Sequence, residues 1–220
     1  MTVLVDYKAG NLASVSLALS RLGVEHRVSG DPAVVRDADR IVFPGVGAAG
    51  SAMETLRATG LGEALTESVK KGTPLLGICI GCQILLDRSE EDGGVACLGI
   101  VPGNVRRFRF DALPDPLPGS GPRPNPGPRP KVPHMGWNTV DFLRSHPLLQ
   151  GVPSGTHFYF VHSYYPVPSE PSAALGRTDY AGTGFAAILE SGNAVATQFH
   201  TEKSGEAGLR ILANFARWRP

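Results

Sequence analysis

The segment from Gly77 to Gln83 reads Gly-Ile-Cys-Ile-Gly-Cys-Gln and carries two cysteines, Cys79 and Cys82, three positions apart. Closely spaced cysteines serve zinc binding, dithiol redox exchange or nucleophilic catalysis by one thiolate. Zinc takes about four protein ligands in a structural site, and the third cysteine of the chain, Cys97, stands alone. We therefore expect no metal and no cofactor.

A redox dithiol is the second interpretation of this segment. Cys79 and Cys82 lie where an apolar run meets a helical pattern, which is the position of a thioredoxin-like motif, and the start of a helix stabilises a thiolate. Two features disfavour it: roughly three βα units precede the motif, and the flanking glycines have no redox purpose. A thiol-disulfide oxidoreductase that uses both cysteines stays open on this pattern alone.

The third interpretation uses the glycines. Gly77-x-Cys79-x-Gly81 has the form of a nucleophile elbow with cysteine in place of serine. The elbow is a sharp strand-to-helix turn that holds the nucleophile in a strained conformation, and the glycines leave room for the crowded backbone. The backbone N–H of Ile80 is then available to a developing oxyanion, and the positive end of a helix starting near Gly81 favours the thiolate. A buried cysteine in a tight turn is the plain alternative.

A nucleophilic cysteine needs a base, and the base needs an orienting group. His200 ends the apolar run Ala-Val-Ala-Thr-Gln-Phe-His, and Glu202 follows two residues later. In extended backbone these two side chains point to the same side, so Glu202 is expected to orient His200. A solvated surface pair is the alternative. With His200 as base, activity is expected to fall on the acid side as the imidazole is protonated.

A glycine-rich loop, Phe-Pro-Gly-Val-Gly at 43–47, follows another apolar run. Without Cβ atoms in the way, such a loop can bring backbone N–H groups to a ligand. An ordinary turn is the alternative.

The elements that must position these residues follow from periodicity. Apolar runs at 2–6, 24–28, 39–45 and 73–80 predict strands, and the intervening segments 11–23 and 49–71 predict helices, with a further helix over 81–88. The second half alternates at 104–110 and 156–165, forms a hairpin pattern over 184–199 and closes with a helix over 206–218 whose apolar face holds Leu209, Leu212, Ala213 and Ala216. We expect a three-layer α/β fold with a mostly parallel central sheet, helices on both faces and an additional antiparallel strand set.

Bulk properties limit the classes of function. The 220 residues suit a single domain over 1–220, and the net charge of +1 gathers neither nucleic acid nor anionic membrane. No apolar run of membrane-spanning length and no signal sequence is visible, and three cysteines suit a reducing cytoplasm. Residues 111–133 hold nine of the 19 prolines and predict an extended surface loop, with a ligand for a proline-reading domain as the alternative.

Three motifs together resemble the class I (triad) glutamine amidotransferases: Gly77–Gln83, Pro44–Gly47 and Gln198–Glu202. The resemblance implies that Cys79 is the nucleophile, His200 the base and Glu202 its partner. It implies removal of the side-chain amide of glutamine through a glutamyl thioester that water hydrolyses. It also implies oxyanion donors at Val46, Gly47 and Ile80, and glutamine contacts at Gly45, Gln83, Glu91, Ser163 and Tyr164.

Further blocks resemble one branch of this family, the glutaminase subunits of imidazole glycerol phosphate synthase in histidine biosynthesis. They are Asp6–Leu12, His134–Asn138 (His-Met-Gly-Trp-Asn), Phe158–Tyr165 and Glu202–Ser204. The resemblance implies that ammonia passes to a cyclase partner, a (β/α)₈ barrel in a heterodimer, which contacts Asn11, Trp137 and Lys203. It also implies that the Val46 peptide reorients when the partner and its ligand bind, so that the free subunit is nearly idle.

The sequence departs from the pattern of this branch at three places. Thr201 replaces the usual proline between histidine and glutamate, Lys8 replaces a glycine, and the proline-rich segment 111–133 is an insertion. Two more functions stay open for this sequence: a stand-alone cysteine hydrolase of similar fold, and a non-catalytic binding subunit that keeps the fold.

Overall fold

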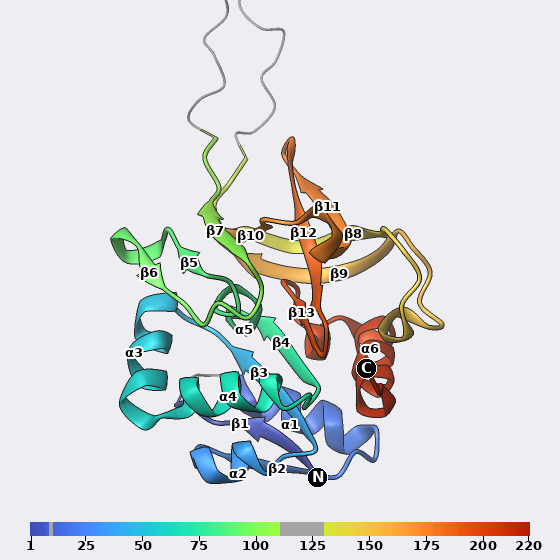
Figure 1. The fold of residues 1–220 in the computed structure, drawn as a ribbon. Helices are drawn as coiled ribbons and strands as arrows, with labels where there is room; N and C mark the ends of the chain where they lie inside the picture. The colour runs from blue at the N-terminus through green and yellow to red at the C-terminus, as the bar shows by residue number, and fades with distance from the viewer. Residues whose placement is uncertain (9–10, 111–129) are drawn as a thin grey trace, which may run out of the picture.

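The computed structural model describes residues 1–8, 11–110 and 130–220. Its larger sheet has the strand order β2–β1–β3–β4–β13–β12–β11–β8–β9 within this part of the chain. Neighbours from β2 to β13 pair in parallel, and neighbours from β13 to β9 pair antiparallel. The antiparallel strands continue beyond the carboxyl end of β4, where the first half of the chain meets the second (Figure 1).

The first half alternates strands and helices, as the apolar periodicity predicts. Its elements are β1 (Thr2–Val5), α1 (Leu12–Arg21), β2 (His26–Ser29), α2 (Pro32–Arg36), β3 (Arg40–Gly45), α3 (Ala49–Thr59), α4 (Leu61–Lys70), β4 (Leu75–Cys79) and α5 (Ile80–Gln83).

The second half is mainly antiparallel. Its strands and final helix are β5 (Arg88–Ser89), β6 (Val95–Ala96), β7 (Gly103–Arg107), β8 (His134–Phe142), β9 (Thr156–His162), β10 (Tyr164–Pro168), β11 (Ala174–Tyr180), β12 (Thr183–Ser191), β13 (Ala194–Thr197) and α6 (Gly205–Arg217). Short 3₁₀ turns lie at Glu91–Gly93, Pro147–Leu149, Pro171–Ala173 and Thr201–Lys203. A smaller sheet has the order β10–β7–β5–β6.

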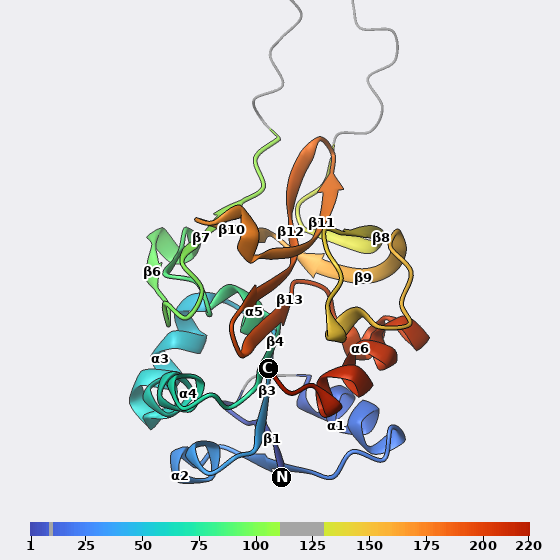
Figure 2. The same cartoon turned by 45° about the vertical axis from the view of Figure 1, so that its right-hand side comes forward.

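Two hydrophobic cores lie on opposite faces of the parallel strands, because successive strand residues point to opposite sides. Ile41 and Phe43 of β3 pack on the side of α2, α3 and α4, whereas Val42 packs on the side of α1 and α6. Figure 2 shows these two helical layers on either side of β1, β3 and β4. The three-layer α/β fold expected from the sequence is therefore confirmed.

Two expected helices differ in the structure. The helix expected over 81–88 is the single turn α5, and Ile84 to Asp87 form turns that lead into β5. The buried face of α6 consists of Gly208, Ile211, Leu212 and Phe215, so the expected face with Leu209, Ala213 and Ala216 is rotated from the observed one.

Most of the proline-rich segment, residues 111–129, lies outside the described residues, so its expected loop character stays a prediction. No helix within the described residues is long and apolar enough to cross a membrane.

Candidate active site

Cys79 lies at the sharp turn between β4 and α5. Its backbone has φ 56 and ψ −107, a conformation that a residue with a side chain rarely adopts. A Cβ atom on Gly77 would lie 2.7 Å from the carbonyl oxygen of Gly81, and one on Gly81 would lie 2.0 Å from that of Phe43. Glycine is therefore required at both positions, because a larger residue would clash with the backbone. The strained turn expected from the sequence is present.

Ile80 is the first residue of α5, so its N–H has no acceptor within that helix. Ile80 lines the cavity in front of Cys79, where this N–H can meet a negative oxygen. A single turn has few aligned peptide dipoles, which weakens the helix-end effect expected for a longer helix. Local N–H groups, rather than a long helix, are the donors near Cys79.

His200 lies beyond the carboxyl end of β13, the neighbour of β4. Its Nδ1 is 2.8 Å from Oε1 of Glu202, and the two side chains are 1% and 0% exposed. The expected pair is therefore present, but the reason differs from the expected one. Glu202 lies in a 3₁₀ turn, and this turn, not strand alternation, brings its carboxylate to His200.

Asn11 joins this pair from the start of α1. Its Nδ2 donates a hydrogen bond of 2.6 Å to Oε1 of Glu202 and lies 3.4 Å from Nδ1 of His200. We expected Asn11 only at the partner interface; the structure adds a contact behind the base. Among the described residues, Nε2 of His200 has no hydrogen-bond partner, so it is available on the side of Cys79.

The pKa of His200 is set by opposing effects. Burial lowers it, but interactions with Cys79 and Glu202 outweigh burial and raise the pKa of His200 to about 10. Burial raises the pKa of Glu202, and the contacts with His200 and Asn11 reverse this and hold it below the usual value. The Glu202 carboxylate therefore favours the protonated imidazole, with the sulfur of Cys79 as the nucleophile beside it. The expected fall of activity on the acid side stays a prediction.

A cavity of about 350 Å³ opens in front of Cys79 and His200. Val46, Gly47, Ile80, Gln83, Glu91, Ser163 and Tyr164, all expected near the substrate, line it together with these two residues. Pro133, Val161 and His162 also line it and were not expected from the sequence. Val161 and His162 are the two residues that precede Ser163 in the chain, which is the signal that could have found them.

The loop after β3 reaches this cavity because Gly45 lies in register with Cys79 on the neighbouring strand. Gly45 does not line the cavity, although it was expected at the substrate. A Cβ atom there would lie 1.9 Å from the hydroxyl of Tyr7, so glycine is needed for packing against that ring. Gly47 has φ 106, a conformation that favours glycine.

Glu91 connects the cavity to the helix that follows this loop. Its Oε2 accepts a hydrogen bond of 2.6 Å from the N–H of Ala49, the first residue of α3. Burial raises the pKa of Glu91 despite this bond. A cationic group in the cavity would favour the carboxylate, as expected for a residue that meets an amino group.

Gln83 of α5 also lines the cavity. Its Nε2 donates to the carbonyl oxygen of Tyr164 at 2.8 Å and to Oε1 of Gln198 at 2.9 Å, while Nε2 of Gln198 lies 3.9 Å from Sγ of Cys79. The Gln83 amide nitrogen thus donates both of its hydrogens to acceptors within the protein. Its Oε1 is the atom that is available to a ligand.

Trp137 and Lys203, expected at a partner interface, are both on the surface. Trp137 is 55% exposed, beside Met135 at 63%, and its ring lies 6.0 Å from that of Tyr159. Single exposed apolar residues are common, but two large ones on one face of a strand are typical of a contact surface.

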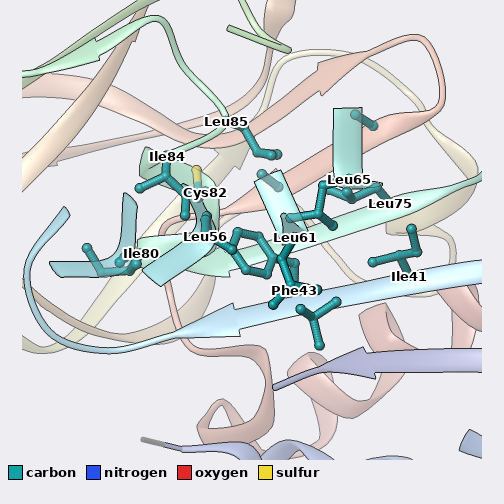
Figure 3. Packing of buried hydrophobic residues seen from close by; sticks show 14 of the residues in the cluster. Ile41, Phe43, Leu56, Leu61, Leu65, Leu75, Ile80, Cys82, Ile84 and Leu85 are labelled. Carbon is teal, nitrogen blue, oxygen red and sulfur yellow. The ribbon is translucent and has the colours of Figure 1, made fainter. Parts of the chain in front are cut away.

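Cys82 is fully buried in the core on the α3 and α4 side of the sheet, between Leu56, Ile84 and Leu85 (Figure 3). Burial raises the pKa of the Cys82 thiol. All three cysteines are free. A thiol that is buried and protonated is a poor partner in disulfide exchange, which disfavours the redox alternative. The described residues contain no cluster of three or more His, Cys, Asp or Glu side chains arranged for a metal ion.

Residues 3–218 match the family model for glutamine amidotransferase class-I. The chain belongs to the class I glutamine amidotransferases. Among curated relatives in this family, it is 48% identical to imidazole glycerol phosphate synthase subunit HisH of Neisseria meningitidis, over 99% of both chains. It is 45% identical to the HisH subunit of Dehalococcoides mccartyi, over 98% of this chain and 96% of that one.

Two solved structures share the fold of this chain. One, described as a glutamine amidotransferase, superposes with a TM-score of 0.69 at 18% identity and covers 98% of this chain and 99% of its own. The structure of PurLQS from Thermotoga maritima superposes with a TM-score of 0.70 at 17% identity and covers 98% and 97%.

Proposed function

We propose that this class I glutamine amidotransferase is the glutaminase subunit of imidazole glycerol phosphate synthase. It hydrolyses glutamine to glutamate and ammonia, and the ammonia passes to a cyclase subunit in histidine biosynthesis. One observation carries the proposal: a strained Cys79 and a buried His200–Glu202 pair open on one cavity in a chain 45–48% identical to HisH subunits.

The first half of the reaction forms a thioester. The Cys79 thiolate attacks the side-chain carbonyl carbon of glutamine and forms the C–S bond. His200, which holds a proton at neutral pH, gives it to the amide nitrogen, the C–N bond breaks, and ammonia leaves. The Glu202 carboxylate stabilises the imidazolium before this transfer and keeps the ring oriented.

The second half regenerates the enzyme. Neutral His200 takes a proton from water, the hydroxide attacks the thioester carbon, and the C–S bond breaks to release glutamate and the thiolate. In both halves the carbonyl oxygen carries negative charge, which the N–H groups of Ile80 and of the Val46–Gly47 loop stabilise. Reorientation of the Val46 peptide completes this site when the partner binds.

The partner is a (β/α)₈-barrel cyclase subunit in a heterodimer. It docks on the surface that carries Trp137 and Lys203, next to Asn11. The exposure of Trp137 and Met135 supports this placement, because Met135 is the cross-strand neighbour of the cavity-lining Val161. A partner bound there receives ammonia without passage through bulk water. The odd cysteine count fits a cytoplasmic location.

Glutamate release, measured with and without the cyclase subunit, tests the proposal. We expect Cys79→Ala to abolish it and Cys82→Ser to retain most of it. We also expect activity to rise strongly when the cyclase subunit is added. Equal loss in the two variants contradicts a single nucleophile, and full activity without a partner identifies a stand-alone hydrolase instead.

A further inference from the structure

Two buried histidines contact each other behind the cavity wall. His162 lines the cavity at the end of β9, and His134 begins the neighbouring strand β8. Nδ1 of His134 lies 2.9 Å from Nε2 of His162, and the two residues are cross-strand neighbours. They are 3% and 5% exposed, and the triad chemistry uses neither of them.

The position of each hydrogen follows from the acceptor at the end of the chain. A carbonyl oxygen only accepts, so Nδ1 of His162, 2.7 Å from the Tyr164 carbonyl oxygen, must be the donor. Nε2 of a neutral His162 is then an acceptor, and Nδ1–H of His134 donates to it. Nε2 of a neutral His134 accepts in turn, and Nδ2 of Asn138 lies 3.4 Å from it.

The amide of Asn138 has its orientation fixed by two other contacts. Its Oδ1 accepts from the N–H of Thr139 at 2.9 Å, and its Nδ2 donates to the Asp179 carbonyl oxygen at 2.8 Å. A flipped amide would place two oxygens against each other at Asp179. The second Nδ2 hydrogen is therefore directed at His134.

Both imidazoles are neutral at physiological pH. Burial lowers the pKa of His134 to about 4 and that of His162 to about 3. Aromatic rings enclose His134: Tyr180 lies 4.1 Å and Phe160 4.8 Å from its ring centre, both stacked. The hydrogen bonds thus all run one way, from Asn138 through His134 and His162 to the Tyr164 carbonyl.

Tyr164 lines the cavity together with Cys79, and its carbonyl oxygen is bonded within the protein. It accepts from His162 and also from Nε2 of Gln83, at 2.8 Å. The preceding carbonyl, on Ser163, accepts from the N–H of Phe108 at 3.1 Å. With both carbonyls turned into the protein, the Ser163–Tyr164 backbone presents a fixed edge to a ligand in the cavity.

We propose that His134 and Asn138 are positioning residues for the glutamine subsite. They fix the tautomer of His162, and through it the Ser163–Tyr164 backbone that holds the amino-acid end of glutamine opposite Cys79. This role rests on the proposed glutaminase function and extends it to two residues that do not touch the substrate.

Two substitutions at one position separate the hydrogen bond from packing. His134→Asn keeps a donor close to the place of Nδ1, whereas His134→Leu has a similar branch without a donor. In the complex with the cyclase subunit, we expect His134→Leu to raise KM for glutamine about tenfold, the loss of one buried hydrogen bond, with kcat changed less than twofold. We expect His134→Asn to recover most of the wild-type KM.

Two covalent probes of Cys79 give a readout that a general loss of structure would not produce. Iodoacetamide tests the triad alone, and a chloroketone analogue of glutamine needs the subsite as well. We expect His134→Leu to react normally with iodoacetamide and about tenfold more slowly with the analogue. Unchanged KM in His134→Leu, or equal loss in His134→Asn and His134→Leu, overturns the proposal.

The tautomer of His162 can be read directly by nitrogen NMR of protein labelled at histidine. We expect the Nδ1-protonated form in the wild type and its loss or exchange in His134→Leu. An Nε2-protonated His162 in the wild type overturns the proposal even if glutamine is hydrolysed. Conversely, absence of Cys79-dependent glutamate release refutes the proposed function while leaving the tautomer result intact. Asn138→Leu, expected to shift the same signal, serves if His134→Leu does not fold.

Discussion

At Cys79 the position of one sulfur atom depends on backbone conformation and on two neighbouring residues without side chains. Strand β4 ends at φ 56, and Gly77 and Gly81 leave no space for a Cβ atom. The strain at this residue is maintained because β3 and β13 hold β4 on both sides. Reactivity at one atom is thus supported by packing that the sheet provides.

Gly81→Ala tests this steric requirement. The added Cβ would lie 2.0 Å from the Phe43 carbonyl oxygen, a backbone atom that cannot move without shifting β3. We expect a loss of about 3 kcal/mol in the free energy of unfolding, measured with urea, together with loss of activity. Gly184→Ala is the matched control, since no heavy atom lies within 4 Å of the added Cβ there, and its expected change is below about 0.5 kcal/mol. Similar losses in the two variants contradict the steric explanation.

Asn11→Asp tests the contact behind the base. The αL backbone at Asn11, with φ 77, accepts Asp as well as Asn. The substitution replaces a hydrogen-bond donor to Glu202 with a second carboxylate, which raises the pKa of Glu202. The interaction of the Glu202 carboxylate with the His200 imidazole is then weaker. We expect alkylation of Cys79 by iodoacetamide in the free subunit to slow about tenfold.

The free subunit is used in that measurement because Asn11 is also proposed to lie at the partner interface. If Asn11→Asp weakens only the binding of the cyclase subunit and leaves alkylation unchanged, the interface is its single role.

The sequence identified most residues of the site, but it did not always give the right structural reason for their positions. Cys79, His200 and Glu202 were identified from spacing, and the structure brings Cys79 and His200 to one cavity with Glu202 behind the imidazole. The strand alternation offered for Glu202 was wrong, because a 3₁₀ turn depends on contacts of Ser204 and α6 that no local pattern encodes. His162 was missed although it directly precedes the expected contact Ser163, because its position in an alternating strand does not distinguish it from a buried structural histidine.

Strands β8 and β9 carry the paired imidazoles, so the stability of this strand pair depends on pH. The folded pKa values of His134 and His162, about 4 and about 3, lie below the unfolded value of 6.5. Between these values the unfolded chain binds more protons than the folded one. Stability from these residues is therefore complete above about pH 6.5 and declines as pH falls toward 4.

We expect the free energy of unfolding to fall between pH 6.5 and pH 4, by roughly 2–3 kcal/mol for each imidazole. Urea unfolding at several pH values measures this slope. His134→Asn removes one titrating group and should make the slope shallower. An identical slope in the variant means that His134 is not neutral in the folded protein.

At the level of elements, strand and helix periodicity predicted the parallel half of the sheet well, because its buried runs are long and bounded by turns. The expected length of α5 was wrong: Ile84, Leu85 and Leu86 continue the helical pattern, yet all three are buried in the hydrophobic core on the α3 and α4 side of the sheet. Tertiary packing, not local preference, ends this helix.

At the level of the whole molecule, the exposed aromatic surface on β8 predicts dependence on a partner. Trp137 is large and exposed, and it lies two residues from Met135, the cross-strand neighbour of the cavity-lining Val161. These are the properties of an interface residue whose truncation costs much binding energy. We expect Trp137→Ala to raise the Kd for the cyclase subunit at least tenfold, as measured by calorimetry, and to leave alkylation of Cys79 in the free subunit unchanged.

Val28→Ala is the control for this variant. Val28 is 45% exposed on β2, which lies at the opposite edge of the larger sheet from β8 and β9, and we expect the substitution to leave the Kd unchanged. An equal effect of both substitutions means that general surface apolarity, rather than this face, governs association.

Strand β8 has two different faces with a period of two residues. Met135, Trp137 and Thr139 point outward, while His134, Asn138 and Val140 belong to the opposite face. Inserting or deleting one residue between positions 134 and 138 would exchange these faces for part of the strand and damage the surface and the imidazole pair together. Insertion or deletion of two residues would keep the alternation of the two faces. Natural length variation within this strand should therefore occur in steps of two, a pattern that aligned relatives of this chain can reveal.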